Sequence, residues 1–227
     1  MGDGRSTPPS AILPRSMGAS RAVPLAVLGS LAAVGAGALW WRRNPSACPY
    51  SQRFWVEAPH PFITRERLRE ALDPQSGQRV LEVGPGTGYY SLPVAGWIAP
   101  EGRLDIFDLQ QEMLDHTMRR ARTQGIENIH PTQGDARSLS YPDASFDRAF
   151  LVTVLGEIPD QPGALSELRR VLKPGGRLVV GELFGDPHWV SPGALRRRAE
   201  EAGLRFERST GPRLGRFAAF VKEATPA

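Results

Sequence analysis

The segment from Val80 to Tyr89, Val-Leu-Glu-Val-Gly-Pro-Gly-Thr-Gly-Tyr, decides the fold of this chain. A mostly apolar run typical of a buried strand leads into glycines at positions 84, 86 and 88, which let the backbone turn sharply and let a ligand approach it closely. A dinucleotide-binding turn spaced G-x-G-x-x-G would require glycine at position 89, and a phosphate-binding loop would require a lysine that this segment lacks. The segment therefore predicts a ligand site at the end of a strand and excludes both nucleotide-phosphate motifs.

Strand-like and helix-like patterns alternate around this segment. We expect strands at 79–83, 104–108, 129–133, 145–154, 177–183, 204–209 and 217–222, and helices at 64–72, 111–123, 162–172 and 192–202, with a short helix between the first two strands. Strands that alternate with helices in this way form a parallel sheet covered on both faces. The chain of 227 residues therefore has an α/β fold with a single core.

Further segments with distinctive residues lie near the ends of the predicted strands. Asp108 ends the second strand, and Gly134-Asp-Ala136 follows the third. The segment Tyr141-Pro-Asp-Ala-Ser-Phe-Asp147 leads into the fourth strand, and Leu168-Arg-Arg-Val-Leu-Lys-Pro-Gly-Gly176 leads into the fifth. All of them follow the glycine turn in a fixed order.

Together these segments resemble the motifs of the class I S-adenosylmethionine (SAM)-dependent methyltransferases, closest to the branch that contains ubiquinone/menaquinone-biosynthesis and related small-molecule enzymes. The resemblance covers about residues 75–222. It implies a Rossmann-like, seven-stranded, mostly parallel sheet of strand order 3-2-1-4-5-7-6 with the last strand antiparallel. It also implies SAM as the cofactor, bound over the carboxyl ends of the strands where the connections change direction.

The resemblance assigns cofactor binding to Glu82, Gly84, Gly86, Gly88, Asp108, Asp135 and Ala136. Asp108, which lies 24 residues after Gly84, is expected to bind the ribose hydroxyls, and Asp105 is the less favoured choice. Asp135 is expected to accept the adenine amino group. Glu82 is expected to orient the glycine turn or to contact the amino-acid end of the cofactor. Alternatively, it only holds the loop and never touches the ligand.

Methyl transfer from a sulfonium is an in-line displacement, so an enzyme has to hold the acceptor near the methyl group, exclude water and, where needed, remove a proton. The resemblance transfers no catalytic base. Thr153 and Glu157 follow the fourth strand and His188 follows the fifth, which makes them the candidates, with His60 a weaker one. Alternatively, Thr153 and Glu157 only cap a loop and His188 is solvated. The single cysteine, Cys48, excludes a cysteine-based metal site and an internal disulfide, and we expect no metal.

The N-terminal part differs from the body. Residues 22–41 form an uncharged run of 20 residues, long enough at about 1.5 Å per residue to cross the roughly 30 Å core of a bilayer. Arginines flank the run, and Trp40 and Trp41 stand where an interfacial aromatic belt lies. We therefore expect a single transmembrane helix, with a cleaved signal peptide, a buried helix or an interfacial hairpin as alternatives. The expected organisation is a disordered tail at 1–21, a transmembrane anchor at 22–41, an aromatic linker and cap helix at 42–74, and the methyltransferase domain at 75–227.

Positive charge is concentrated in the same N-terminal part. Residues 1–53 carry six arginines against one aspartate, a net charge of +5, so the remaining residues carry −1 of the total of +4. A body with so little positive charge disfavours DNA or RNA as the substrate.

The predicted anchor and the aromatic linker point to a small, lipophilic methyl acceptor such as a quinone, an isoprenoid or a lipid. Because SAM is made and kept in the cytosol, we expect a single-pass membrane protein whose catalytic domain is cytoplasmic. Two other functions stay open. One is a SAM-binding sensor or scaffold without turnover, and the other is a methyltransferase for a soluble substrate or a nucleic acid.

Overall fold

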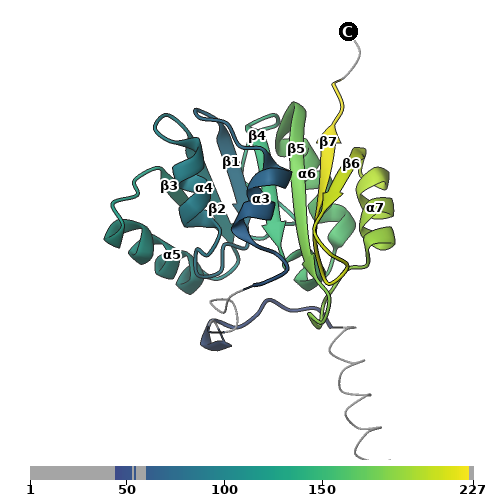
Figure 1. Cartoon of the computed structure of the whole chain (residues 1–227), viewed down its shortest axis with the longest axis horizontal. Coiled ribbons are helices and arrows are strands. Elements are labelled where there is room, and N and C mark those ends of the chain that lie inside the picture. The colour runs from purple at the N-terminus through teal and green to yellow at the C-terminus, as the bar shows by residue number, and fades with distance from the viewer. Residues whose placement is uncertain (1–43, 53, 55–59, 225–227) are drawn as a thin grey trace, which may run out of the picture. The chain divides into compact units, whose positions relative to one another are not determined.

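One seven-stranded sheet forms the centre of the molecule. The computed structural model describes residues 44–52, 54 and 60–224. The strands lie in the order β3-β2-β1-β4-β5-β7-β6 (Figure 1). Neighbouring strands are parallel from β3 to β5, whereas β7 runs antiparallel to both β5 and β6. The predicted strand order and the antiparallel last strand are therefore confirmed.

The elements follow the predicted alternation closely. The strands are β1 (Arg79–Val83), β2 (Arg103–Asp108), β3 (Ile129–Gln133), β4 (Phe146–Val152), β5 (Leu172–Leu183), β6 (Leu204–Thr210) and β7 (Gly215–Lys222). The helices are α3 (Arg65–Leu72), α4 (Ser91–Ile98), α5 (Gln111–Thr123), α6 (Gln161–Val171) and α7 (Pro192–Glu201), with short 3-10 helices η1 (Tyr50–Gln52) and η2 (Leu155–Glu157). The largest difference from the prediction is β5, which begins at Leu172 and not at Arg177. Leu172 already pairs with Phe146, and the register between the two strands then shifts, so Gly175 and Gly176 lie in an irregular part of the strand.

Side-chain caps fix where several helices begin. Thr64 accepts a hydrogen bond from the backbone N–H of Arg67 at the start of α3, and Asp160 accepts one from Gly163 at the start of α6. Leu68 and Leu72 then fall on one buried face of α3. The predicted cap helix thus packs on the sheet and is part of the domain body.

The helices cover the two faces of the sheet in separate groups. Helices α3, α4 and α5 bury apolar side chains against one face, and α6 and α7 cover the other (Figure 1). On the α6 and α7 face the connection between β3 and β4 is irregular, and Tyr141 packs there against Phe107 and Phe146 with ring centroids 5.9 and 4.9 Å away. An aromatic side chain thus covers this part of the core.

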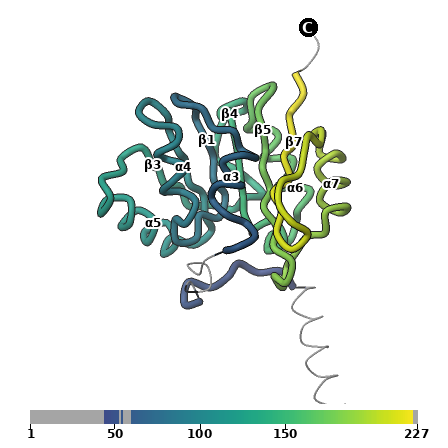
Figure 2. The backbone as a smooth tube through the Cα atoms, in the orientation of Figure 1, coloured from purple at the N-terminus to yellow at the C-terminus, as the bar shows by residue number. Residues whose placement is uncertain are grey.

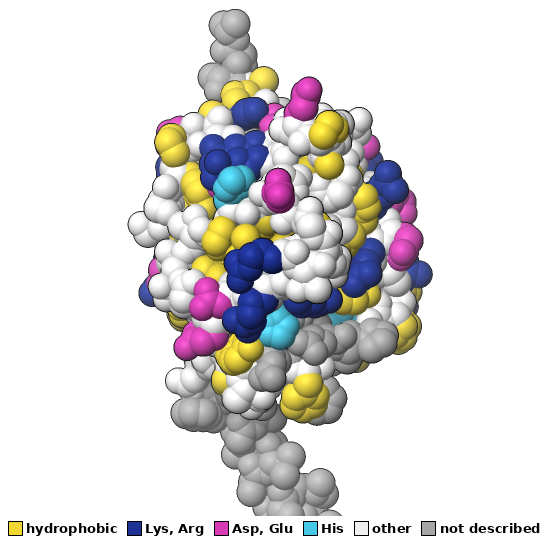
Figure 3. Space-filling view, turned by 90° about the vertical axis from the view of Figure 1, so that its left-hand side faces the viewer, with side chains coloured by type: hydrophobic (Ala, Val, Ile, Leu, Met, Phe, Trp, Pro, Cys, Tyr) yellow, Lys and Arg dark blue, Asp and Glu magenta, His cyan; other side chains and the backbone are white. Residues whose placement is uncertain are grey.

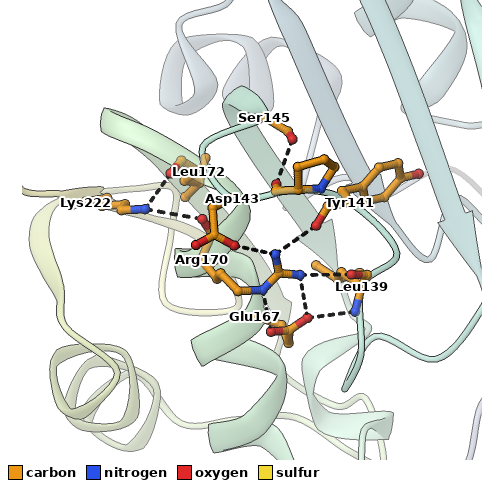
Figure 4. Close-up of polar contacts among 9 residues, drawn as sticks. Leu139, Tyr141, Asp143, Ser145, Glu167, Arg170, Leu172 and Lys222 are labelled. Carbon is orange, nitrogen blue, oxygen red and sulfur yellow. Dashed lines mark hydrogen bonds and ion pairs between the residues drawn. The ribbon is translucent and has the colours of Figure 1, made fainter.

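A polar network built on Arg170 fixes that irregular connection (Figure 4). The guanidinium donates to the backbone oxygens of Leu139 and Tyr141 at 2.9 and 2.8 Å, and to the carboxylates of Asp143 and Glu167. Two of the sequence segments that carried the family resemblance therefore meet in one network. Their shared role in this chain is to join α6 to the loop that leads into β4.

Replacing Arg170 with alanine is expected to lower the free energy of unfolding by about 2–4 kcal/mol, because several charge-assisted hydrogen bonds are lost together and Glu167 loses its ion-pair partner. Urea unfolding followed by circular dichroism measures the change. Arg197→Ala, at an exposed position of α7, is the control and is expected to change stability by less than about 0.5 kcal/mol. A loss as small as that at Arg170 would contradict a structural role for the network.

Strand β3 forms one edge of the sheet, and Figure 3 looks onto that side of the molecule. Pro131 is exposed in this strand and has no N–H to donate. Lys, Arg and His side chains are scattered over the same surface (Figure 3). Proline and charge at an edge strand discourage the addition of a further strand.

The predicted tail at 1–21 and the predicted membrane span at 22–41 lie outside the described residues. Among the residues that are described, no helix is both long enough and apolar enough to cross a bilayer.

Candidate cofactor and acceptor site

A cavity of about 330 Å³ lies at the carboxyl ends of β1, β2, β3 and β4. Most of its wall comes from residues that directly follow these strands, and the rest from the N-terminal segment. The lining residues are Pro45–Cys48, Val83, Gly84, Gly86, Phe107, Asp108, Leu109, Gln110, Met113, Gly134–Arg137, Val152–Val154 and Glu157–Pro159. The cavity therefore surrounds the point between β1 and β4 where the strand order reverses, which is where the resemblance implies that SAM binds.

The glycine turn forms part of the cavity wall. Gly84 has φ +72°, and a Cβ atom there would overlap the side chain of Val154. Gly86, at φ +55°, also lines the cavity. Gly88 is not among the lining residues, and a Cβ atom on it would lie 3.0 Å from Thr117 Cγ2 on α5. The first two glycines thus open the cavity, whereas the third allows close packing against α5.

Asp108 presents a carboxylate to this cavity. Only 8% of the residue is exposed, and its Oδ1 accepts a hydrogen bond from the backbone N–H of Gln110 at 2.8 Å. Burial raises the pKa of Asp108 to about 6, so the side chain is mostly ionised at neutral pH. The alternative residue, Asp105, forms ion pairs with Arg79 at 2.9 Å and Arg103 at 2.8 Å and does not line the cavity.

Asp135 and Ala136 line the same cavity after β3. The carboxylate of Asp135 is paired with the guanidinium of Arg137 at 2.6 Å, and this pairing holds the pKa of Asp135 below its usual range. Asp135 is therefore an ionised hydrogen-bond acceptor at neutral pH, as an adenine-binding role requires.

Glu82 is buried within β1 and does not line the cavity. Its Oε2 accepts a hydrogen bond from Ser91 Oγ at 2.5 Å, which joins β1 to the first turn of α4. Burial raises the pKa of Glu82 to about 8. This geometry fits the predicted role of orienting the glycine turn, because Glu82 and Ser91 hold the two ends of that turn together.

Of the candidate catalytic residues, Thr153 and Glu157 line the cavity. Thr153 has φ +55°, an unusual conformation for a β-branched residue. Glu157 accepts a hydrogen bond from the backbone N–H of Cys48 at 3.3 Å, and burial raises its pKa to about 8. Both residues follow the end of β4, as predicted.

The two histidine candidates lie elsewhere. His188 lines a separate hollow with Trp189 and Arg198, and its backbone N–H donates to Asp186 at 2.8 Å. The ring of His60 packs edge-on against Tyr89 at 5.3 Å. Neither histidine lines the cavity that contains Asp108 and Glu157.

Sequence reasoning missed two parts of the wall: the N-terminal residues Pro45–Cys48, and Gln110 at the start of α5. The sequence marked the linker for its aromatic residues. Of these, Tyr50 bonds to His116 on α5, Phe54 is 56% exposed, and Trp55 lies outside the described residues. No local pattern marked residues 45–48, because their partners are far away in the sequence.

The residues present fit SAM on their own chemistry. An ionised, largely buried carboxylate provides acceptors for ribose hydroxyls, and the glycine turn leaves room that a Cβ atom at position 84 would fill. The flanking walls are mostly apolar, which suits an adenine ring and a thioether.

Comparisons with known proteins agree with this geometry. The methyltransferase domain family matches residues 80–176. The ubiquinone/menaquinone biosynthesis C-methyltransferase of Coxiella burnetii is 37% identical over 136 residues, 60% of this chain and 50% of that protein. The demethylmenaquinone methyltransferase of Geobacillus kaustophilus is 33% identical over 126 residues, 53% of this chain and 54% of that protein. The chain therefore spans about half the length of these relatives.

Solved structures share the fold. A SAM-dependent methyltransferase from Aquifex aeolicus superposes with a TM-score of 0.72 at 20% identity, covering 78% of this chain and 100% of that one. The [4+2]-cyclase SpnF superposes with a TM-score of 0.64 at 21% identity, covering 71% of this chain and 80% of that one. The ordered motifs, the sheet topology and the sequence matches together show that this chain belongs to the class I SAM-dependent methyltransferases.

Proposed function

We propose that this protein transfers a methyl group from SAM to a small, lipophilic acceptor of the hydroquinone or phenol type, and that it does so at the membrane. The observation that carries the proposal is the composition of one cavity wall. Asp108 and the glycine turn line the same cavity as Glu157, Ile158 and Pro159. Groups suited to the cofactor and groups suited to an acceptor thus share one enclosed space.

Residues of the turn and of β2 and β3 bind the cofactor in this proposal. When bound, SAM supplies an electrophilic methyl group on a sulfonium. Asp108 accepts hydrogen bonds from the ribose hydroxyls, and Asp135 with Ala136 binds the adenine edge. Gly84 and Gly86 allow the backbone to approach the ligand. Val83, Phe107 and Met113 exclude water from the same space.

Glu157 is the proposed general base. The proton of an acceptor hydroxyl passes to the Glu157 carboxylate, which leaves the acceptor electron-rich enough to form a bond to the methyl carbon while the bond from that carbon to sulfur breaks. A base works best when its pKa lies near the operating pH, and burial raises the pKa of Glu157 to about 8. The ionised form is then a substantial fraction near pH 8.

The apolar part of the wall supports a lipophilic acceptor. Pro45, Ala47, Ile158 and Pro159 offer hydrocarbon surface next to Glu157. Both relatives described above are named as quinone-pathway methyltransferases. The uncharged run at 22–41 would anchor the chain in the membrane in which such acceptors dissolve, with the catalytic body on the cytoplasmic side where SAM is kept.

The test uses the full chain in a mild detergent with methyl-labelled SAM and 1,4-naphthohydroquinone as the probe acceptor. Label that enters the organic extract in wild-type protein, and not in Asp108→Ala, supports the proposal. SAM binding without transfer to this probe or to reduced membrane-lipid extracts would overturn it in favour of a SAM sensor. Turnover has to be measured directly, because a fold that also supports a [4+2]-cyclase does not by itself specify methyl transfer.

Glu157→Gln is expected to slow methyl transfer by about 100-fold, because it removes the proton acceptor but keeps an oxygen for the Cys48 N–H. The wild-type rate is expected to rise about tenfold per pH unit below pH 8 and to level off above it, since only the ionised carboxyl acts as a base. The variant is expected to lose this dependence. Glu112→Gln, at an exposed position of α5, is the control. A variant that keeps a third of the wild-type rate would exclude Glu157 as the base.

A further inference from the structure

The segment Asn44–Gln52, here called the strap, runs past the carboxyl ends of the parallel strands (Figure 2). Pro45, Ser46, Ala47 and Cys48 form one side of the cavity wall. The strap makes few apolar contacts of its own, since residues 44–52 are all exposed or only half-buried. Hydrogen bonds are therefore the main interactions that hold the strap in place.

Gln110 provides two of these hydrogen bonds from a single side chain. Its Nε2 donates to the backbone oxygen of Cys48 at 2.9 Å, and its Oε1 accepts from the backbone N–H of Tyr50 at 3.2 Å. A carboxamide that pairs with one backbone C=O and one backbone N–H imitates a neighbouring backbone. This pairing needs both functions of the amide, which glutamate or leucine at position 110 would not supply.

The backbone of Gln110 is in turn hydrogen-bonded to Asp108, the carboxylate that is proposed to bind the cofactor. Its N–H donates to Asp108 Oδ1 at 2.8 Å. A ligand that binds Asp108 therefore also affects Gln110, whose side chain is hydrogen-bonded to the strap. The two residues also line the same cavity, so a ligand there touches Asp108, Gln110 and the strap together.

Other contacts attach the strap on both sides of the cavity. On the β4 side, the N–H of Cys48 donates to Glu157 at 3.3 Å. On the β2 side, Tyr50 Oη lies 3.1 Å from His116 Nδ1, and Arg119 donates to the same oxygen at 3.4 Å. The strap thus spans the cavity from η2 to α5, and Gln110 is the contact between these two attachments.

We propose that Gln110 is a positioning residue that holds the strap closed over the cofactor cavity and couples that closure to the occupancy of Asp108. This inference rests on the proposed function, in that SAM is the ligand that binds Asp108. Release of the Gln110 contacts opens the strap side of the cavity, and a ligand bound against both walls slows that release. The strap then controls how long the cofactor stays.

The test combines hydrogen exchange with cofactor release, using the full chain in a mild detergent. In Gln110→Ala without any cofactor, the hydrogen-bonded amides of Cys48, Tyr50 and Gln52 are expected to exchange at least about tenfold faster than in the wild type, because the two hydrogen bonds of the Gln110 side chain are lost. Exchange in β1 and β4, and the free energy of unfolding, are expected to stay unchanged. Gln111→Ala is the matched control: its side chain bonds only to Asp115 on the surface of α5, so it is expected to behave as the wild type.

Cofactor release supplies the second readout. SAM is expected to dissociate about tenfold faster from Gln110→Ala, with a smaller change in the association rate, and to slow strap exchange in the wild type. Unchanged strap exchange in Gln110→Ala would overturn the inference, whatever the protein binds. Faster strap exchange with an unchanged dissociation rate would overturn the coupling. A wild type that binds no SAM would refute the proposed function and the coupling, while strap exchange would still report separately on the hold exerted by Gln110.

Discussion

Asp108→Ala is expected to weaken SAM binding at least about 100-fold. A carboxylate that accepts hydrogen bonds from two ribose hydroxyls contributes two charge-assisted bonds, each worth about 1.5–3 kcal/mol, and alanine supplies neither. Titration calorimetry on the full chain in a mild detergent measures the loss. Asp115→Ala, on the exposed face of α5, is the matched control and is expected to change affinity less than about twofold. An Asp108→Ala protein that binds within threefold of the wild type would remove Asp108 from the site.

Protonation of Asp108 is expected to weaken SAM binding in the same way, and its extent can be varied through the pH. The folded, ligand-free protein holds the pKa of Asp108 at about 6, above the usual value for an aspartate, because burial penalises the charged form. The ionised carboxylate accepts much stronger hydrogen bonds than the protonated carboxyl does, so SAM affinity is expected to fall by up to about tenfold between pH 7 and pH 5. In Asp108→Asn the affinity is expected to be low and nearly independent of pH over this range.

The sequence was sufficient for the fold because the decisive signals are local. The turn at Gly84 requires positive φ and close approach, both of which are properties of the residue itself. Asp108 could be assigned from its place at a strand end, and the structure puts it in the cavity wall while Asp105 is ion-paired elsewhere. Strand and helix periods predicted the alternation, and the largest difference is the irregular start of β5 at Leu172.

The contacts that complete the site are not local, and the sequence does not show them. Cys48 and Glu157 are 109 residues apart in the chain, and Gln110 and Cys48 are 62 apart. Nothing in the composition of residues 45–48 indicates that they form a wall. Residues 45–48 line the site but could not be recognised from the sequence. The motif around Arg170 is the reverse case, because it helped to identify the family although its contacts in this chain are structural. Recognition of the family thus rests partly on cavity residues such as Asp108 and partly on residues, such as Arg170, whose contacts are structural.

Raising the pH is expected to destabilise the ligand-free protein, and Glu82 is expected to account for a measurable share. Burial raises the pKa of Glu82 to about 8, whereas the unfolded chain titrates near the usual value of about 4.3. The folded state therefore holds a proton that the unfolded state has lost. Below about pH 4 Glu82 is protonated in both states and does not change the free energy of unfolding. Above that pH the free energy of unfolding falls steadily until Glu82 ionises in the folded protein near pH 8.

Glu82→Gln tests this directly, because the amide oxygen can still accept the hydrogen bond from Ser91 and the side chain no longer titrates. Between pH 5.5 and 8 the free energy of unfolding of the wild type is expected to fall more steeply than that of the variant, by roughly 1 kcal/mol per pH unit. Urea unfolding at several pH values measures both slopes. Glu70→Gln, at an exposed position of α3, is the matched control and is expected to parallel the wild type. Parallel slopes for wild type and Glu82→Gln would show that Glu82 is ionised in the folded protein.

The two buried carboxyls near the glycine turn then hold different charge states at neutral pH. The charge of Asp108 disfavours ionisation of Glu82 and, after burial, contributes to the raised pKa of Glu82. Asp108, with a pKa of about 6 and a hydrogen bond from the Gln110 N–H, ionises first and keeps the charge that ribose binding needs. Glu82 remains protonated and serves the turn through Ser91. It follows that Asp108→Asn should lower the pKa of Glu82 and make the fall in stability begin to level off at a lower pH than in the wild type.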